Sequence, residues 1–516
     1  MTDILAALLE SCARTPDASA LTLGPVTLTY DELRSRVLRI AASVAREGLE
    51  PGDRVLFSVR PELDGIALAL GIIAAGGTVV FADPGAGEAL FRARAELAAP
   101  KWVAAESILY FGSTWMLRPI TRRRGIELPR YSRVVPGARH IVSGSWLPGT
   151  PLGALSIARL LSGAEATGVR GASEDEALII FTSGTTSDPK AVVHTRASLG
   201  TGLADFSKRI GFEPGERLLT DQLMVGIPAL IAGAHWSLPP HGANPGAAPG
   251  AYLNLLPDAD LLFAVPAALD AMLTLLESRP EKRPRLRGIL VGGAPVLRPL
   301  LERVRDQLPG TRVFAIYGMT EILPVAIADG DDKLAFEGPG DFVGELMPSV
   351  RARIDEGELV LCGDGLAPRY LGAAPLDELR TGDLASLDGD RLVLAGRSKD
   401  MFIRGTTNVY PGLYEPVIAQ LPGLSDAALL GIANAIGDDQ LVLVIVPRAY
   451  TGVIAAAHPS VDAVRRALPG LIDSAVLPDV ILVAPSLPRS GRSQKLDRSA
   501  LLELVTAATG PGATEL

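Results

Sequence analysis

Short apolar runs alternate with amphipathic segments along most of the chain. Residues 3–60 predict a helix, a β-hairpin, a second helix with Asp31 as its N-cap, and a strand over 53–57. A further helix from about Leu63 leads into a strand that closes in a turn at 83–85. Because alternating strands and helices are typical of parallel α/β layers, the pattern predicts a layered α/β fold.

The apolar run over residues 65–82 approaches the length of a membrane span. It contains Gly71, Gly76 and Gly77, and it ends in the β-branched and aromatic residues of a strand. A buried helix followed by a strand is therefore favoured over a transmembrane segment. The opening residues MTDILAALLESC carry early acidic residues and no basic region, unlike a secretory signal. The sequence predicts a soluble, cytoplasmic protein.

The pattern changes after about residue 348. Short strands separated by glycine-rich turns are predicted at 350–354, 358–362, 384–387 and 391–395. A hinge candidate at 396–400 follows. The remainder reads as a small α+β unit, with strands over 427–432, 441–446 and 479–483 and a helix over 461–468. It ends in a lysine-tipped loop at 487–495, which we expect to be mobile.

Three predicted strands end in polar or glycine-rich clusters, at 182–190, 292–295 and 317–321. The first cluster follows an apolar strand and begins with Thr182, Ser183, Gly184, Thr185, Thr186 and Ser187. Such a loop is able to wrap a polyanion, since hydroxyl and N–H groups donate and Lys190 adds a point charge. A Ser/Thr-rich surface turn is the alternative. Ligands gather at the carboxyl ends of strands in open α/β sheets, which favours a binding site over three unrelated turns.

Two segments each leave two interpretations open. Residues 106–146 join apolar and aromatic residues to a run of arginines. We favour a helical excursion with a solvated basic end over an amphipathic patch that docks on a membrane surface or an acidic carrier protein. Residues 222–257 contain no Asp, Glu, Lys or Arg. They are equally consistent with an apolar substrate tunnel and with a core helix followed by a Pro/Gly loop.

Composition and charge narrow the class of protein. A chain of 516 residues that is 48% hydrophobic is able to bury the cores of two or more domains. The net charge of -9 argues against a dedicated nucleic-acid binder. The two cysteines form no disulfide framework, and the five histidines show no metal-ligand spacing. Of the 49 basic residues only seven are lysines, and Lys190, Lys399 and Lys495 lie in the motifs described below.

Seven stretches, in order, resemble the adenylate-forming superfamily of acyl- and aryl-CoA synthetases, peptide-synthetase adenylation domains and luciferases. They are FTSGTTSDPK at 181–190, GGAP at 292–295, YGMTE at 317–321, TGD at 381–383, GRSKD at 396–400, GTTNVYPGLYE at 405–415 and PRSGRSQKLDR at 488–498. The resemblance implies a large N-terminal domain, 1–396, of layered α/β sheets plus a distorted β-barrel. It also implies a small mobile α+β lid, 397–516, that rotates about a backbone hinge near Lys399.

The resemblance also assigns roles in the attack of a carboxylate on the α-phosphate of ATP. The loop Thr182–Lys190 is implied to hold the β- and γ-phosphates, Thr320 to donate to the α-phosphate, and Glu321 to bind Mg²⁺. Tyr317 and Gly318, with the turn of Gly293, Ala294 and Pro295, are implied to contact adenine, and Asp383 and Arg397 to contact the ribose. Lys495 is implied to bridge the carboxylate and the α-phosphate, so Lys495, Thr320 and Glu321 are the catalytic candidates.

Some positions depart from the family pattern. Ser187, Ala191 and Gln494 each stand where the family commonly has glycine, and Met224 stands where an aromatic residue or histidine is frequent. The first two departures predict a less mobile loop rather than lost activity. Met224 leaves the gating of the acyl group open.

The acyl acceptor is not fixed by the motifs. CoA is favoured as co-substrate, with an apolar carboxylic acid as substrate and an acyl carrier or pathway enzyme as a possible partner. Stretches 79–85, 292–296 and 317–326 resemble the bacterial olefin-pathway branch, which includes β-lactone synthetases that close a β-hydroxy acyl-adenylate onto itself and shades into fatty acyl-CoA ligases. An amide-forming ligase is a further alternative. From another class, Ser187 and Gln494 motivate a weakened nucleotide- or acyl-binding protein.

Overall fold

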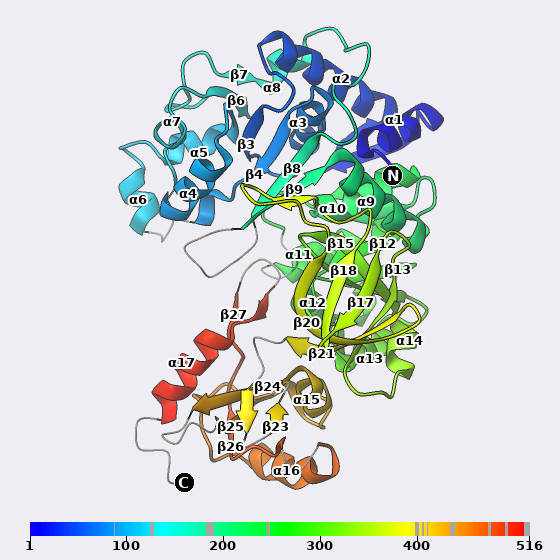
Figure 1. Ribbon diagram of the computed structural model, residues 1–516, viewed down its shortest axis with the longest axis vertical. Helices are drawn as coiled ribbons and strands as arrows, with labels where there is room; N and C mark the ends of the chain where they lie inside the picture. The colour runs from blue at the N-terminus through cyan, green and yellow to red at the C-terminus, as the bar shows by residue number, and fades with distance from the viewer. Residues whose placement is uncertain are drawn as a thin grey trace.

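The computed structural model describes residues 1–86, 88–123, 128–181, 190–243, 245, 248–397, 402–404, 407–409, 411–433, 439–472, 476–490 and 494–509. A large upper part carries most of the helices and strands, and a smaller part, residues 402–509, lies below it (Figure 1). Two large sheets build the upper part, and a three-stranded sheet builds the smaller one. The mixed α/β fold predicted from the sequence is confirmed.

The first large sheet has eight strands, in the order β19-β9-β8-β4-β3-β5-β6-β7. Their bounds are Arg369–Tyr370, Ala191–Thr195, Glu176–Phe181, Thr78–Phe81, Arg54–Ser58, Trp102–Glu106, Arg139–Ser143 and Leu155–Ser156. The strands from β8 to β7 are parallel, whereas β9 and β19 add an antiparallel edge. The helices of this part are α2 (Tyr30–Arg46), α3 (Leu63–Ala74), α4 (Glu88–Ala98), α5 (Ser107–Gly112), α6 (Arg118–Arg123), α7 (Tyr131–Val134) and α8 (Ile157–Leu161).

The apolar run from residue 65 forms a helix and a strand, as predicted. All residues of α3 from Gly65 to Ala74 are buried, which explains why this helix lacks a polar face. A Cβ on Gly71 would lie 2.6 Å from Cγ2 of Ile40 on α2, so the glycine permits close helix packing. Among the described residues no helix is both long and apolar enough to cross a membrane.

The N-cap of α2 is Thr29, and not Asp31 as predicted. The Thr29 hydroxyl accepts from the backbone N–H of Glu32 at 3.2 Å, and the Glu32 carboxylate accepts from the N–H of Thr29 at 2.8 Å. This reciprocal capping box satisfies two amides, so it prevails over a single Asp cap. Asp31 lies in the first turn, where its charge still favours the positive end of the helix.

The second large sheet has thirteen strands, in the order β17-β18-β20-β21-β16-β15-β14-β13-β12-β10-β11-β1-β2. Their bounds are Arg351–Asp355, Glu358–Cys362, Leu379–Asp388, Arg391–Arg397, Asp341–Leu346, Ile322–Asp329, Arg312–Met319, Gly288–Gly292, Leu261–Ala264, Arg217–Leu219, His235–Leu238, Ser19–Leu23 and Val26–Thr29. The strands from β14 to β1 are parallel, and those from β14 to β17 are antiparallel. The short strands expected after residue 348 therefore extend the parallel part of this sheet as antiparallel strands.

Helices on this sheet are α1 (Ile4–Arg14), α9 (Arg196–Ile210), α10 (Leu223–Ala232), α11 (Pro249–Leu253), α12 (Pro266–Ser278), α13 (Arg298–Gln307) and α14 (Gly330–Ala335). Helix α10 decides between the two interpretations for part of the uncharged segment 222–257. Val225 to Leu230 are buried, and a Cβ on Gly226 would lie 2.2 Å from the ring of the fully buried Trp236. These residues thus form a core helix, one of the two interpretations left open.

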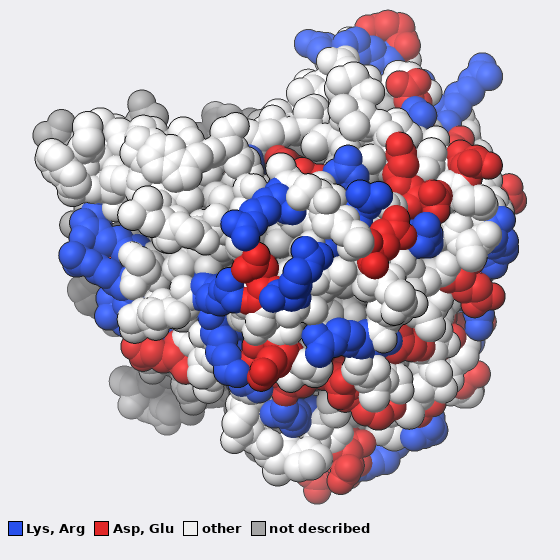
Figure 2. All heavy atoms as spheres, turned by 90° about the horizontal axis from the view of Figure 1, so that it is seen from above, with Lys and Arg blue, Asp and Glu red and all other residues white. Residues whose placement is uncertain are grey.

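The segment 106–146 forms the short helices α5, α6 and α7 before β6, as the favoured interpretation predicts. Tyr110 and Tyr131 anchor it in the core, with ring centroids 5.2 Å apart. Trp115 and Met116, between α5 and α6, remain 78% and 65% exposed. Figure 2 shows charged side chains of both signs mixed over much of the face seen from above, and an uncharged lobe at its left.

The smaller part is built on β24 (Leu424–Ala433), β25 (Asp439–Pro447) and β26 (Val480–Val483). Alternate residues of β25 enter two cores: Leu441, Leu443 and Ile445 face one side, and Val442, Val444 and Val446 face the other. Helices α15 (Pro411–Ile418) and α16 (Pro459–Ala467) cover the first side, and α17 (Arg498–Thr509) covers the second. The short pairs β22 (Phe402–Arg404) with β23 (Thr407–Val409), and β27 (Arg489–Ser490) with β28 (Lys495–Leu496), complete it.

Candidate functional site

Two of the three polar strand ends lie side by side. Strands β13 and β14 are parallel neighbours, and Gly292 is paired with Ile316, so the turns that follow both strands open at the same sheet edge. Gly293 has a φ of 86°, the left-handed backbone that this turn needs and that glycine adopts without strain. Ala294, which is partly buried, and Pro295, which is exposed, follow it.

The first contact of the site joins Tyr317 to Asp383. The Tyr317 hydroxyl donates to Oδ2 of Asp383 at 2.6 Å, and only 4% of Asp383 is exposed. A short hydrogen bond to a buried carboxylate is among the stronger polar contacts in a protein. Asp383 on β20 is also paired with Arg397 on β21. The structure thus brings together three residues that the sequence assigned to the nucleoside, although the side chain of Arg397 lies outside the described residues.

The second contact joins Glu321 to the exit of the candidate phosphate loop. The Tyr370 hydroxyl donates to Oε1 of Glu321 at 2.8 Å, and the ammonium of Lys190 lies 5.4 Å from the centre of the Tyr370 ring. Burial, reinforced by the charge of Glu321, raises the pKa of Tyr370, so its hydroxyl stays protonated and remains a donor. Lys190 directly precedes β9 of the eight-stranded sheet, and Glu321 lies in the turn between β14 and β15 of the thirteen-stranded sheet.

The neighbouring turn residue, Thr320, is held through its backbone. Nε2 of His194 lies 2.8 Å from the Thr320 carbonyl oxygen, and Nδ1 lies 3.3 Å from the Ser198 hydroxyl. Burial lowers the pKa of His194, so the ring is neutral at pH 7. A carbonyl accepts only, which assigns the proton to Nε2. A Cβ on Gly318, two residues before Thr320, would lie 2.7 Å from Cδ1 of Leu323, so a side chain there would require Leu323 to move.

Lys495 lies on a hairpin of the smaller part. It is exposed, it pairs with Ser490, and the hairpin projects from the smaller part toward the larger one (Figure 1). Gln494 has a φ of 51°, a conformation that glycine adopts most easily. The residue that replaces the family's glycine therefore has a left-handed backbone conformation. Arg489 supports this turn by donating to the Gln494 carbonyl at 3.0 Å and by pairing with Asp426.

Several predicted residues lie outside the described residues. These are the loop from Thr182 to Pro189, which contains Ser183, Gly184, Thr185 and Thr186, the hinge residue Lys399, and residues 491–493. Of the candidate phosphate loop, Lys190 is described, and it is exposed. Sequence reasoning missed Tyr370 and His194. Each contacts the 320–321 turn from a strand of the other sheet, and no local motif records such a pairing.

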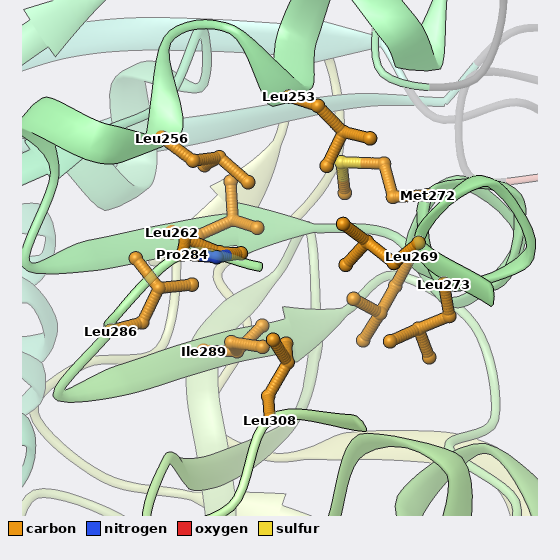
Figure 3. Close-up of a pocket in the computed structure, with 11 residues that line it drawn as sticks. Leu253, Leu256, Leu262, Leu269, Met272, Leu273, Pro284, Leu286, Ile289 and Leu308 are labelled. Atoms are coloured by element: carbon orange, nitrogen blue, oxygen red, sulfur yellow. The ribbon is translucent and has the colours of Figure 1, made fainter. Parts of the chain in front are cut away.

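A small apolar pocket in the thirteen-stranded part does not belong to this site. It has a volume of about 10 Å³ and is lined by apolar side chains from α11, α12, β12, β13 and neighbouring loops (Figure 3). This is the size of one water molecule, and an apolar cavity of that size stays dry. It is a packing void of the core. Among the described residues no group of three or more His, Cys, Asp or Glu is arranged to hold a metal ion.

Comparison with known proteins gives a consistent family. The family model described as AMP-binding enzyme matches residues 8–371. The isonitrile lipopeptide synthase of Streptomyces coeruleorubidus is 30% identical over 64% of this chain and 24% of its own length. The feruloyl-CoA synthase of Amycolatopsis sp is 27% identical over 84% of this chain and 86% of its own length. In fold, the chain is similar to the amide bond synthetase McbA of Marinactinospora thermotolerans, with a TM-score of 0.77, 19% identity, and coverage of 97% and 99%.

Proposed function

Because this chain belongs to the AMP-binding enzyme family, we propose that it joins a carboxylic acid to AMP and then passes the acyl group to the thiol of CoA. In the first step a carboxylate oxygen attacks the α-phosphate of ATP, and pyrophosphate leaves. In the second step the thiol attacks the acyl carbon, and AMP leaves. The observation that carries the proposal is a pair of contacts made from one strand end: Tyr317 binds Asp383, and four residues later Glu321 binds Tyr370, whose ring lies 5.4 Å from the Lys190 ammonium.

The nucleoside would lie at the carboxyl ends of β13 and β14. The half-buried ring of Tyr317 offers a face for adenine, and the turn of Gly293, Ala294 and Pro295 borders it. Asp383 would accept hydrogen bonds from the ribose hydroxyls, with Arg397 opposite it on β21. The Tyr317 hydroxyl keeps the Asp383 carboxylate oriented for this role.

The phosphates would extend toward the 320–321 turn and the loop from Thr182 to Lys190. Glu321 is suited to Mg²⁺, a hard cation that prefers carboxylate and phosphate oxygens and retains several waters. With no larger set of metal ligands among the described residues, the ATP phosphates would complete the coordination. Bound there, the ion would neutralise the charge that gathers on the phosphates during the transfer. Thr320 would donate to the α-phosphate.

Lys495 would complete the site from the smaller part. We propose a division into residues 1–396 and 397–516, with a backbone pivot near Lys399. The cores support it, because those of the smaller part contain residues from 402 onward and none from the larger part among the described residues. The ammonium of Lys495 would bridge the incoming carboxylate and the α-phosphate, where negative charge develops.

The class of acid is tested with a broad panel, because the uncharged segment 222–257 that suggested an apolar acid forms a core helix over 225–230. Adenylation is tested first. Purified protein is incubated with ATP, Mg²⁺ and a panel of aliphatic, aromatic and β-hydroxy acids, and exchange of labelled pyrophosphate into ATP is measured. We expect exchange that depends on the acid. Its absence across the panel would overturn the proposal in favour of a binding protein that has lost catalysis.

Product analysis with the best acid then separates the acceptors. AMP release that requires CoA, with formation of a thioester, supports the proposed ligase. AMP release from a β-hydroxy acid without CoA identifies lactone closure instead. Product formation that needs an added amine or a carrier protein identifies the corresponding transferase.

A further inference from the structure

A two-residue strand connects the two large sheets beside the candidate site. Strand β19 follows β18 of the thirteen-stranded sheet along the chain, yet it pairs with β9 at the edge of the eight-stranded sheet. Its register places Arg369 opposite Val193 and Tyr370 opposite Val192. The next residue, Leu371, donates to the Ala191 carbonyl at 2.8 Å. This connection therefore lies directly beside the exit of the candidate phosphate loop.

The side chains of Arg369 and Tyr370 contact different sheets, because successive residues of a strand point to opposite faces. Arg369 forms an ion pair with Glu176 on β8, and Glu176 also binds Arg54 on β3 at 3.2 Å. These contacts fix the strand to the eight-stranded sheet. Tyr370 instead reaches Glu321 in the turn between β14 and β15 of the other sheet. The strand is thus held on one side while its tyrosine makes a contact between the sheets.

We propose that Tyr370 is a positioning residue that holds the Glu321 carboxylate in place for Mg²⁺ and supports Lys190 for the phosphates of ATP. The proposal rests on the proposed function, since it requires Glu321 to bind the metal. The hydroxyl fixes one carboxylate oxygen at 2.8 Å. The ring face attracts the Lys190 ammonium at 5.4 Å, within the range of a cation–π contact.

The contacts of Tyr370 with Glu321 and Lys190 support a role for this tyrosine beyond packing. The carboxylate of Glu321 ends a flexible side chain, so a donor that restricts it lowers the entropy lost when a ligand binds. Residues that hydrogen-bond a metal-binding carboxylate typically change metal affinity or activity by about 10- to 100-fold when removed. One tyrosine contacts both a candidate metal ligand and a candidate phosphate ligand, so it sets their mutual placement.

The test compares binding of ATP with and without the metal. Calorimetry is performed on the intact protein with ATP plus Mg²⁺ and with ATP plus EDTA. Tyr370→Phe removes the hydroxyl and keeps the ring, so we expect about tenfold weaker binding of Mg²⁺–ATP and unchanged binding of metal-free ATP. Tyr370→Leu also removes the ring beneath Lys190, so it should weaken both forms. Tyr110→Phe is the matched control, because its hydroxyl contacts Nδ1 of His140 at 2.9 Å, a residue that has no assigned role in the site.

A double mutant separates positioning from a general structural effect. In a Glu321→Gln background, Tyr370→Phe should no longer change the preference for Mg²⁺–ATP, since the carboxylate it orients is gone. Two results would overturn this proposal and leave the proposed function standing. In one, the Tyr370→Phe variant binds Mg²⁺–ATP as tightly as the unmodified protein. In the other, it binds Mg²⁺–ATP and metal-free ATP with equally weakened affinity. Failure of the unmodified protein to bind Mg²⁺–ATP would overturn the proposed function together with it.

Discussion

The hydrogen bond between Tyr317 and Asp383 gives the sharpest quantitative test of the nucleotide site. Replacement of Tyr317 by Phe keeps the ring and removes the donor, and replacement of Asp383 by Asn removes the charge. The donor–acceptor distance is 2.6 Å, and Asp383 is 4% exposed, so water has little access to replace the lost donor. Hydrogen bonds to charged groups contribute about 1.5–3 kcal/mol.

We therefore expect the two substitutions to be coupled by at least about 1.4 kcal/mol in kcat/KM for ATP, which corresponds to a factor of about ten. The assay is acid-dependent pyrophosphate exchange with ATP varied, performed on both single variants and the double variant. The effect of Tyr317→Phe alone should lie mainly in KM, because its ring is still available to adenine. The Tyr110→Phe variant again serves as the control.

Additive effects would refute this reasoning. Independent sites combine to within about 0.3–0.5 kcal/mol, so a coupling in that range would mean that the tyrosine does not orient the aspartate. A large loss in Tyr317→Phe that persists unchanged with Asn at position 383 would assign the hydroxyl to a different partner.

Three further outcomes are expected. Lys495→Ala should slow adenylation by about 10²–10³ while leaving transfer from a supplied acyl-adenylate within a few-fold, whereas an equal loss in both steps would contradict its role. His235 is 5% exposed, and burial together with the charge of Arg217 lowers its pKa to about 4. Because the unfolded chain therefore takes up a proton at a higher pH than the folded protein, the free energy of unfolding should fall by about 3 kcal/mol from pH 6.5 to 4. His235→Gln should flatten that part of the profile in denaturant unfolding, and an identical profile would refute the assignment. Gly226→Ala should lower the melting temperature through its clash with Trp236, with loss of about 1–3 kcal/mol, and an unchanged melting temperature would show that the core relaxes.

The elements that could be predicted from the sequence are those with a local signal. Strand β25 was predicted because its long apolar run is bounded by polar residues, and both faces of that strand are indeed buried. The polar ends of β13 and β14 were predicted because apolar runs change abruptly to glycine or polar residues. The cap of α2 was mispredicted although its signal was present, since Thr29 and Glu32 have the spacing of a capping box.

The contacts that organise the site could not be predicted in this way. Tyr370 and Glu321 are 49 positions apart, and His194 and Thr320 are 126 apart. Both pairs form between two sheets, whose placement depends on the packing of whole layers rather than on local periodicity. The same holds for β19, a two-residue strand that is too short to leave a periodic pattern.

The most direct test of the central claim follows the carboxylate oxygen. An acid that supports pyrophosphate exchange is labelled with heavy oxygen in its carboxyl group and incubated with the protein, ATP, Mg²⁺ and hydroxylamine as acyl acceptor. Attack of the carboxylate on the α-phosphate, followed by attack of the acceptor on the acyl carbon, places one labelled oxygen in AMP and none in pyrophosphate. Mass spectrometry should find this pattern. Label in inorganic phosphate with release of ADP, or AMP without label, would contradict the proposed adenylation.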